Sequence, residues 1–329
     1  MTFRRRLGAV MPIAALSGLM VSAQQAQTPH ATKDVVRINV QVSDGTRPVL
    51  GLHLDDFDVL DNGVQQRLDA AGLAGHVALA LAIDTSLSSR DESMASLSGP
   101  EPAVFPSILR ASDRLLSALA PGDRATLVAV ADRIIPLVPL TEEPHAWQQG
   151  LTRVQGLPPR AGALFSDGRG ATTFDHETDG LMPQSTLWDG VFMAASLVAR
   201  DPGVPLVVIL SDGIDVGSWL TRAHVSRTLA NLGIAVDFVQ TPRRRWHTGN
   251  AVPEDLPKET GGVRYKTDDS KLGERFKARL DDLRQTYVLT FEPRGVSAND
   301  NWHDVVVKVK GRNVNVKARP GYYASRSAK

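Results

Sequence analysis

The segment "DTSLSS" at residues 84–89 places one carboxylate and several small hydroxyls directly after the apolar run "HVALALAI". In an extended or gently turning backbone, Asp84, Ser86 and Ser88 can point the same way. One carboxylate with two hydroxyls is a hard-oxygen set, which suits Mg²⁺, Mn²⁺ or Ca²⁺ and does not suit softer metals. The same residue types also cap helices and shape turns, so the neighbouring elements must decide between these roles.

Two further segments supply similar side chains. "QSTLWDG" opens a helix with Thr186, and "VVILSDG" ends a second apolar run with Asp212. Simpler structural roles exist for both, because Thr186 and Asp189 have the spacing of a capping box and Asp212-Gly213 is a common turn. Either Thr172 or Thr173 is an alternative to Thr186, although neither so clearly opens a helix.

The elements around these segments favour a shared site. The run "VALALAI" is apolar at every position, which is typical of a strand covered on both faces. Strands that alternate with helices predict an α/β fold with a doubly wound, mainly parallel sheet. In such a sheet ligands bind beyond the carboxyl ends of the strands, where Asp84 and Asp212 are expected. The expected strands lie near residues 77–83, 125–132, 205–213 and 234–241, and the expected helices near 105–119, 145–157, 187–199, 222–233 and 272–287.

The segments "DTSLSS", "STLWDG" and "LSDGID" follow the order and spacing of a metal-ion-dependent adhesion site (MIDAS). Over residues 76–285 the sequence thus resembles a von Willebrand factor type A (VWA) domain. Its flanks are similar to exported bacterial proteins called VWFA-related. The resemblance implies one divalent cation, Mg²⁺ first, and a protein partner whose Asp or Glu completes the coordination. The resemblance also implies five metal ligands, the last of them often acting through water: Asp84, Ser86, Ser88, Thr186 and Asp212.

The segments on either side of the α/β region show the period of two expected of half-buried β-strands. Asn62-Gly63 predicts a hairpin turn, and "DVVVKVKGRNVNVKARPGYY" predicts a second hairpin around Gly311. A lone hairpin is marginally stable in water, so we expect residues 33–75 and 286–329 to pack together as one small accessory sandwich.

The first residues have the pattern of a targeting signal. Arg4, Arg5 and Arg6 precede an apolar stretch that ends in small residues, which predicts a cleavable signal peptide at residues 1–23.

The chain has no cysteine, so disulfides, thiol catalysis and thiolate metal sites are excluded. With 37 Lys and Arg against 36 Asp and Glu, no global field favours nucleic acid. A periplasmic or extracellular location is expected, with no later transmembrane segment.

Several residues near the expected carboxyl ends of the strands, here called the rim, have side chains suited to binding a partner protein. A basic and aromatic loop follows "IAVDFVQT", and Trp219 follows the Asp212 motif. The loop is also explained as an ordinary solvated segment, and the indole of Trp219 by local packing. The stretch 156–184, rich in Gly, Pro and Asp, is expected to shape access, and it lacks the alternation of an EF-hand loop. The partner-binding candidates are Arg243, Arg244, Arg245, Trp246 and Trp219.

These features predict a divalent-metal-dependent, adhesion-type binding protein and not an enzyme. No nucleophile elbow, Walker A loop or dinucleotide fingerprint is present in the sequence. Two alternatives remain open. The ion could activate water in a hydrolase, or it could only stabilise a structural component of the envelope.

Overall fold

The computed structural model describes residues 35–86, 89, 104–157, 185–215, 217–241, 250–251, 255–297 and 302–324. By its contacts the chain separates into Met1–Lys33 and Asp34–Lys329, and all described residues lie in the second unit. The expected signal peptide at residues 1–23 therefore lies outside the described residues. So do Ser88, the stretch 158–184 and residues 243–246. No helix of the described part is long and apolar enough to cross a membrane.

The central sheet has six strands: β6 (Val77–Asp84), β7 (Arg124–Val130), β8 (Ile134–Thr141), β9 (Val204–Ser211), β11 (Ala235–Gln240) and β13 (Arg264–Lys266). Their order across the sheet is β13-β11-β9-β6-β7-β8. All neighbours are parallel except β7 and β8, which are antiparallel. The mainly parallel sheet predicted from the sequence is thus confirmed.

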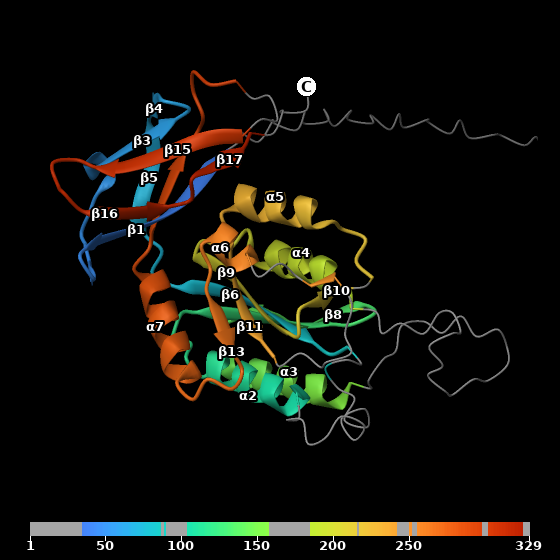
Figure 1. Ribbon diagram of the computed structural model, residues 1–329. Coiled ribbons are helices and arrows are strands. Elements are labelled where there is room, and N and C mark those ends of the chain that lie inside the picture. The colour runs from blue at the N-terminus through green and yellow to red at the C-terminus, as the bar shows by residue number, and fades with distance from the viewer. Residues whose placement is uncertain are drawn as a thin grey trace, which may run out of the picture. The chain divides into compact units, whose positions relative to one another are not determined.

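Helices cover both faces of this sheet (Figure 1). One face packs against α2, α3 and α7, and the other against α4, α5 and α6. The sheet is therefore doubly wound, as expected. The helices are α2 (Val104–Leu116), α3 (Pro144–Gly156), α4 (Leu187–Val198), α5 (Arg222–Leu232), α6 (Leu256–Thr260) and α7 (Leu272–Arg284).

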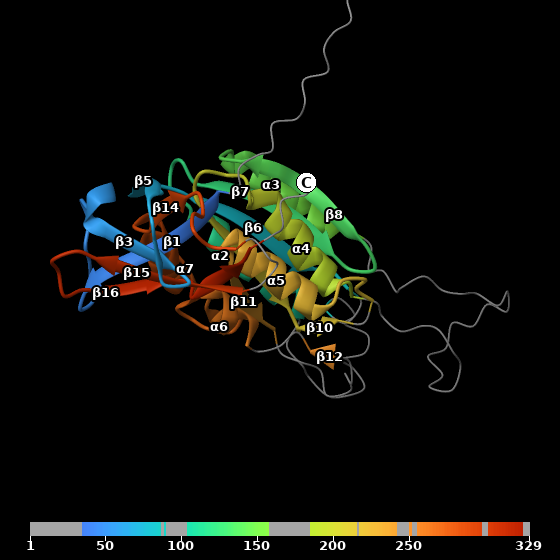
Figure 2. The same ribbon diagram turned by 90° about the horizontal axis from the view of Figure 1, so that it is seen from above.

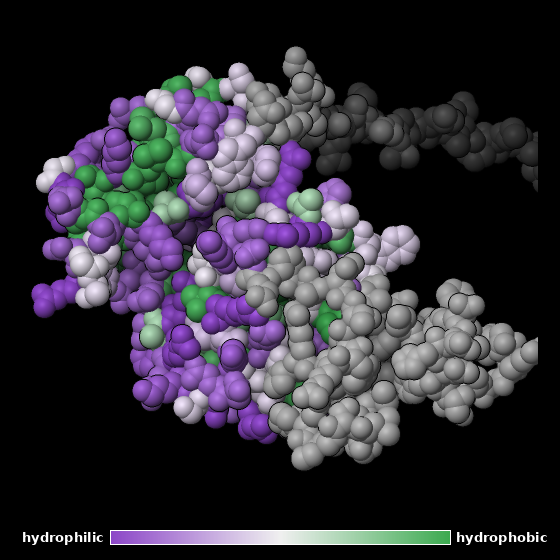
Figure 3. All heavy atoms as spheres, in the orientation of Figure 1, coloured by the Kyte–Doolittle hydropathy of each residue, from purple (hydrophilic) through white to green (hydrophobic). Residues whose placement is uncertain are grey.

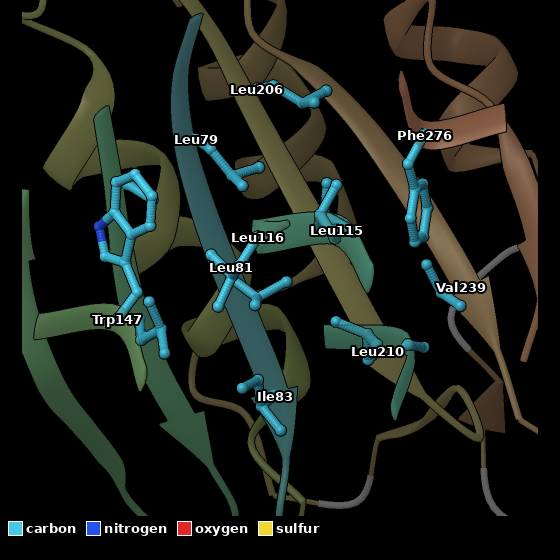
Figure 4. Packing of buried hydrophobic residues seen from close by; sticks show 14 of the residues in the cluster. Leu79, Leu81, Ile83, Leu115, Leu116, Trp147, Leu206, Leu210, Val239 and Phe276 are labelled. Atoms are coloured by element: carbon cyan, nitrogen blue, oxygen red, sulfur yellow. The ribbon is translucent and has the colours of Figure 1, made fainter. Parts of the chain in front are cut away.

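The sequence of β6 explains how the two layers differ. Leu79, Leu81 and Ile83 point to one face, where they pack among side chains of α2, α3, β9 and α7 (Figure 4). The alternating positions on the other face are alanines, and α4 packs directly over them. Small side chains on a strand let a helix approach closely, so the alanine face of β6 lets α4 pack directly against the strand.

The flanking segments form two antiparallel sheets. The first contains β1 (Val36–Asp44), β2 (Arg47–Pro48), β5 (Leu68–Leu73), β14 (Tyr287–Phe291) and β16 (Asn315–Ala318). The second contains β3 (Phe57–Asp61), β4 (Val64–Gln66), β15 (Trp302–Val309) and β17 (Gly321–Tyr323), with the short helix η1 (Leu54–Asp56) before β3. Their inner faces share one apolar core, so the expected accessory sandwich is confirmed. Figure 2 shows these strands gathered at one end of the α/β layers.

One of the two hairpins predicted for the sandwich forms, and the prediction of the other is wrong. β3 and β4 pair through Asn62 and Gly63, which have positive φ angles of 48° and 80°, the backbone of a tight hairpin turn. The expected hairpin around Gly311 does not form. Instead β15 pairs with β3 and β17 while β16 pairs with β1, so the chain crosses between sheets after Gly311. Alternation shows which side chains face a core, but not which sheet a strand joins.

Two arginines attach the sandwich to the α/β layers. Arg37 of β1 donates hydrogen bonds to the main-chain carbonyls of Asp201, Pro202 and Gly203. Arg319, which follows β16, donates to the carbonyls of Ala230 and Asn231 at the end of α5. Carbonyl groups at a helix end lack helical partners, and a cation there is favourable. Figure 3 shows mostly hydrophilic surface near α5 and α7, while part of the accessory strands carries an apolar area.

Candidate metal centre

The carboxyl ends of β6 and β9 meet at the point where the chain reverses its direction across the sheet. After β8 the chain returns to the other side of β6 and forms β9 there. Crevices at such switch points are the common ligand sites of open α/β sheets. Here the Ser211 hydroxyl at the end of β9 donates a 2.6 Å hydrogen bond to Oδ2 of Asp84 at the end of β6.

Asp84 is fully buried, and its second oxygen, Oδ1, accepts a 2.9 Å hydrogen bond from the Ser86 amide. Asp212 is also buried, with 2% of its surface exposed. Burial first, and the negative charge of Asp212 second, raise the pKa of Asp84 well above its usual value, although hydrogen bonds from Ser211 and Ser86 oppose this. Two carboxylates are thus held close together in a buried place, which is unfavourable unless a cation lies between them.

The end of β7 holds Thr186 beside this pair. The carbonyl of Val130 accepts the Thr85 amide at 2.8 Å, and the next carbonyl, that of Ala131, accepts the Thr186 amide at 2.8 Å. Thr85 and Thr186 are therefore fixed by consecutive residues of one strand end. The Thr186 hydroxyl also donates to Ala131 at 2.9 Å. A hydroxyl that donates its proton in this way directs its oxygen lone pairs elsewhere, as a metal ligand requires.

The simpler alternative for Thr186 and Asp189, a capping box, does not form. Thr186 is the N-cap residue of α4, but its side chain makes no capping hydrogen bond. Oδ1 of Asp215, in the short strand β10 (Ile214–Asp215) that pairs with β12 (Asn250–Ala251), accepts the Leu187 amide at 2.8 Å instead. The Ser218 hydroxyl accepts the Trp188 amide at 3.0 Å. The α4 amides are capped from another loop, which frees the Thr186 hydroxyl from that role.

Asp189, in the first turn of α4, accepts hydrogen bonds from the same loop that caps the helix. Its two oxygens accept the amides of Trp219 at 2.9 Å and Leu220 at 2.8 Å. We call the hydrogen bonds of Asp189, Asp215 and Ser218 the α4 clamp. It ties the helix that carries Thr186 to the loop that begins at Asp212. Sequence reasoning missed this clamp, and the only signal for it was a second aspartate in "SDGID".

The residues present fit a hard divalent cation. Four of the candidate ligands, Asp84, Ser86, Thr186 and Asp212, lie buried at one end of the sheet. The hydroxyls of Ser89 and Ser185 beside them are buried without a hydrogen-bond partner among the described residues. Among the described residues, no group of three or more His, Cys, Asp or Glu is placed to hold a metal ion.

Of the remaining candidate residues, those for metal ligation or partner binding, only one is among the described residues. The fifth candidate ligand, Ser88, and the basic loop of Arg243, Arg244, Arg245 and Trp246 lie outside the described residues. Trp219 is described and is 93% exposed.

Known proteins similar to this chain are found among solved structures. No protein-family model matches the chain, and no curated protein sequence matches it. Among solved structures, it is similar to a von Willebrand factor type A protein from Catenulispora acidiphila, with 12% identity, a TM-score of 0.43, and coverage of 90% of this chain and 74% of that one. The vWF domain of the pili tip protein Mfa5 from Porphyromonas gingivalis matches at 11% identity and a TM-score of 0.41, over 64% of this chain and 95% of that one.

A third match is proximal thread matrix protein 1 from the mussel byssus, in a form with a zinc-occupied MIDAS motif. Its identity is 15% and its TM-score 0.43, over 67% of this chain and 48% of that one. The solved structures to which this chain is similar thus include von Willebrand factor type A proteins.

Proposed function

We propose that this protein binds a divalent cation at the carboxyl ends of β6 and β9 and uses it to bind a protein partner. The ligands are Asp84, Ser86, Ser88 and Thr186, with Asp212 acting through water. The buried pair of Asp84 and Asp212 carries the proposal, because it places two negative charges where solvent cannot compensate them. The same ends of the sheet supply neutral hydroxyl oxygens.

The ligand set favours recognition of an acidic partner. If Asp212 acts through water, Asp84 is the one carboxylate of the set in direct contact with the ion. The bound cation would supply positive charge and open coordination positions, which suit an Asp or Glu of the partner. The hydroxyls of Ser86 and Thr186 add no negative charge to oppose that carboxylate. Mg²⁺ is the first ion to test, followed by Mn²⁺ and Ca²⁺.

Binding is favoured over metal-assisted hydrolysis by the contacts of three of the five histidines among the described residues. His76 contacts Asp201, and His303 contacts Asp61 in the sandwich. His224 contacts Thr221 at the start of α5. A hydrolase needs a group beside the ion to move a proton, and these three imidazoles are held by other partners. We therefore propose that the protein is not an enzyme.

The remaining assignments follow from the sequence. We propose a division into a signal peptide at residues 1–23, a VWA domain at 76–285, and an accessory sandwich made of 33–75 and 286–329. The signal peptide implies export to the periplasm or beyond. Arg243, Arg244, Arg245 and Trp246 would contribute a cationic and aromatic part of the partner-binding rim.

A displayed library of random 12-residue peptides tests this function. The mature protein is immobilised, the library is applied in Mg²⁺, and bound clones are eluted with EDTA. The expected clones are rich in Asp and Glu, bind the wild type, and do not bind Asp84→Ala. The matched control is Asp268→Ala, which removes an exposed aspartate and should bind as the wild type does. If EDTA elutes no clone above background, or Asp84→Ala binds the clones equally well, the proposal fails.

A further inference from the structure

Trp219 is exposed to an unusual degree for a tryptophan. Its side chain is 93% exposed, while Trp147 and Trp188 of the same α/β layers are 5% and 7% exposed. Tryptophan is on average a highly buried residue, since its indole is large and mostly apolar. An indole left in water therefore suggests a surface that another molecule covers.

The exposure of Trp219 does not come from a loosely held backbone. Its amide donates to Oδ2 of Asp189 at 2.9 Å, and the next amide, of Leu220, donates to Oδ1 at 2.8 Å. On the other side, the Ser218 hydroxyl donates to Oδ1 of Asp215 at 2.5 Å. The α4 clamp thus fixes the main chain on both sides of an indole that has almost no protein contact of its own. A rigid aromatic side chain loses little conformational entropy when a partner binds it.

The clamp also places Trp219 next to the candidate metal centre. The Gly217 amide donates a 3.2 Å hydrogen bond to the carbonyl of Ser185, the residue before Thr186. Trp219 follows Gly217 by two residues, so their Cα atoms are at most about 7.6 Å apart. Asp189, which holds Trp219, is in the first turn of the helix that Thr186 begins. The ion ligands and the indole therefore belong to one rim.

We propose that Trp219 is the second anchor of the partner site and packs against an apolar side chain of the segment whose carboxylate binds the ion. This rests on the function proposed above. An extended peptide advances about 3.3 Å per residue, so two to four residues span about 7–13 Å. The partner segment accordingly has an acidic residue and, two to four positions away, a proline, aliphatic or aromatic residue. Such pairing of a charged and an apolar anchor gives both orientation and affinity.

The clones eluted by EDTA from the peptide library provide the test. They should show an apolar residue two to four positions from a shared Asp or Glu. Binding of these peptides to Trp219→Ala should be about 30-fold weaker, the size of effect found at tryptophan hot spots. The matched control is Trp302→Ala, which removes a partly exposed indole of the accessory sandwich and should leave binding unchanged. Mg²⁺ affinity should be the same in Trp219→Ala as in the wild type, since the indole does not hold the ion.

A second variant tests the role of the clamp. Asp189→Ala releases the amides of Trp219 and Leu220, so it should weaken peptide binding while the indole is still present. If the peptides depend on Mg²⁺ and on Asp84 but bind Trp219→Ala as tightly as the wild type, the inference is wrong and the proposed function stands. If no Mg²⁺-dependent peptide is found, the proposed function fails and this inference fails with it.

Discussion

The hydroxyl of Ser211 donates a 2.6 Å hydrogen bond to Oδ2 of Asp84, joining the carboxyl ends of β9 and β6. This contact is made between residues 127 positions apart in the chain. It leaves Asp84 buried beside the negative charge of Asp212, at the switch point of the sheet. We expect this arrangement to lower the stability of the metal-free protein, and under the proposed function a cation would relieve the repulsion, a common compromise at functional sites.

Removing one of the two charges should therefore stabilise the metal-free protein. Asp212→Asn keeps an oxygen for the Ile214 amide, which Oδ1 of Asp212 accepts at 3.0 Å. In EDTA the variant should melt a few degrees above the wild type, because the repulsion of Asp84 is gone. In Mg²⁺ it should gain less from the ion than the wild type does. Differential scanning calorimetry in both buffers measures this, and a lower melting temperature of the variant in EDTA would contradict it.

The α4 clamp should control metal affinity without contacting the ion. Asp215→Ala removes the acceptor of the Leu187 amide, and capping losses of this kind cost about 1 kcal/mol. We expect the free energy of unfolding to fall by that amount and Mg²⁺ affinity to fall severalfold, since Thr186 is no longer fixed relative to Asp212. Urea unfolding and calorimetric titration measure the two effects. The clamp has no role at the metal centre if stability falls while affinity is unchanged.

Sequence alone predicted four of the six central strands and five of the six α-helices among the described residues, and it failed where distant residues determine the outcome. The buried run of β6 and the spacing of apolar residues in α7 are local patterns. The capping of α4 by Asp215 and Ser218 is not, because it depends on a loop far along the chain. Tyr287 lies where the expected last helix and the following expected strand overlap; it begins β14, where its hydroxyl donates to the carbonyl of Val49.

β8 was missed for a related reason. It contains Pro136 and Pro139, which cannot donate to a ladder and argue against a central strand. The strand lies at the edge of the sheet, next to β7 alone, where prolines are tolerated. Its antiparallel direction follows from the short connection to β7. Whether a strand lies at the edge of a sheet depends on the whole topology, so no local sequence pattern indicated that β8 is an edge strand.

Gly190 should be required for the close packing of α4 on β7. A Cβ atom at this position would lie 2.6 Å from Cγ2 and 2.9 Å from Cγ1 of Val130. Gly190→Ala should therefore destabilise the protein by about 1–3 kcal/mol, as overpacking usually does. Val130→Ala makes room for the added methyl group, so the double variant should lose less stability than the two single variants together. Strict additivity in urea unfolding would show that the two residues do not interact.

A buried ion pair should fix α7 against the sheet. Arg279 of α7 donates to Asp237 of β11 at 3.2 Å, and their side chains are 10% and 2% exposed. Burial raises the pKa of Asp237 although Arg279 opposes it, so this carboxylate depends on its partner. Arg279→Met should cost about 3–5 kcal/mol, the range for breaking a buried pair. The control is Lys277→Met on the same helix, whose pair with Asp281 is exposed and should contribute less than about 1 kcal/mol. Equal losses in chemical unfolding would contradict this account of α7.

Acid should weaken the contact network around Asp201. Burial alone would raise the pKa of Asp201, but the hydrogen bond from the Gly203 amide, then His76 and Arg124, lower it below its usual value. A carboxyl group with a lowered pKa in the folded state contributes stability above its unfolded pKa of about 3.9, and this is lost as the pH falls through the folded value. The wild type should therefore be more stable than Asp201→Asn at pH 7, with a difference that shrinks below about pH 4. A difference that does not change with pH would show that the charge of Asp201 is unimportant.

The central claim is that Asp84 and its neighbours hold a divalent cation. The most direct measurement is calorimetric titration of Mg²⁺, and then Mn²⁺, into EDTA-stripped mature protein, beside Asp84→Ala and the control Asp268→Ala. The titration should extend to millimolar metal, because a site without its partner's carboxylate binds weakly. The account predicts one site in the wild type and in the control, and none in Asp84→Ala. Equal binding by Asp84→Ala and the wild type, or no binding by either, would contradict it.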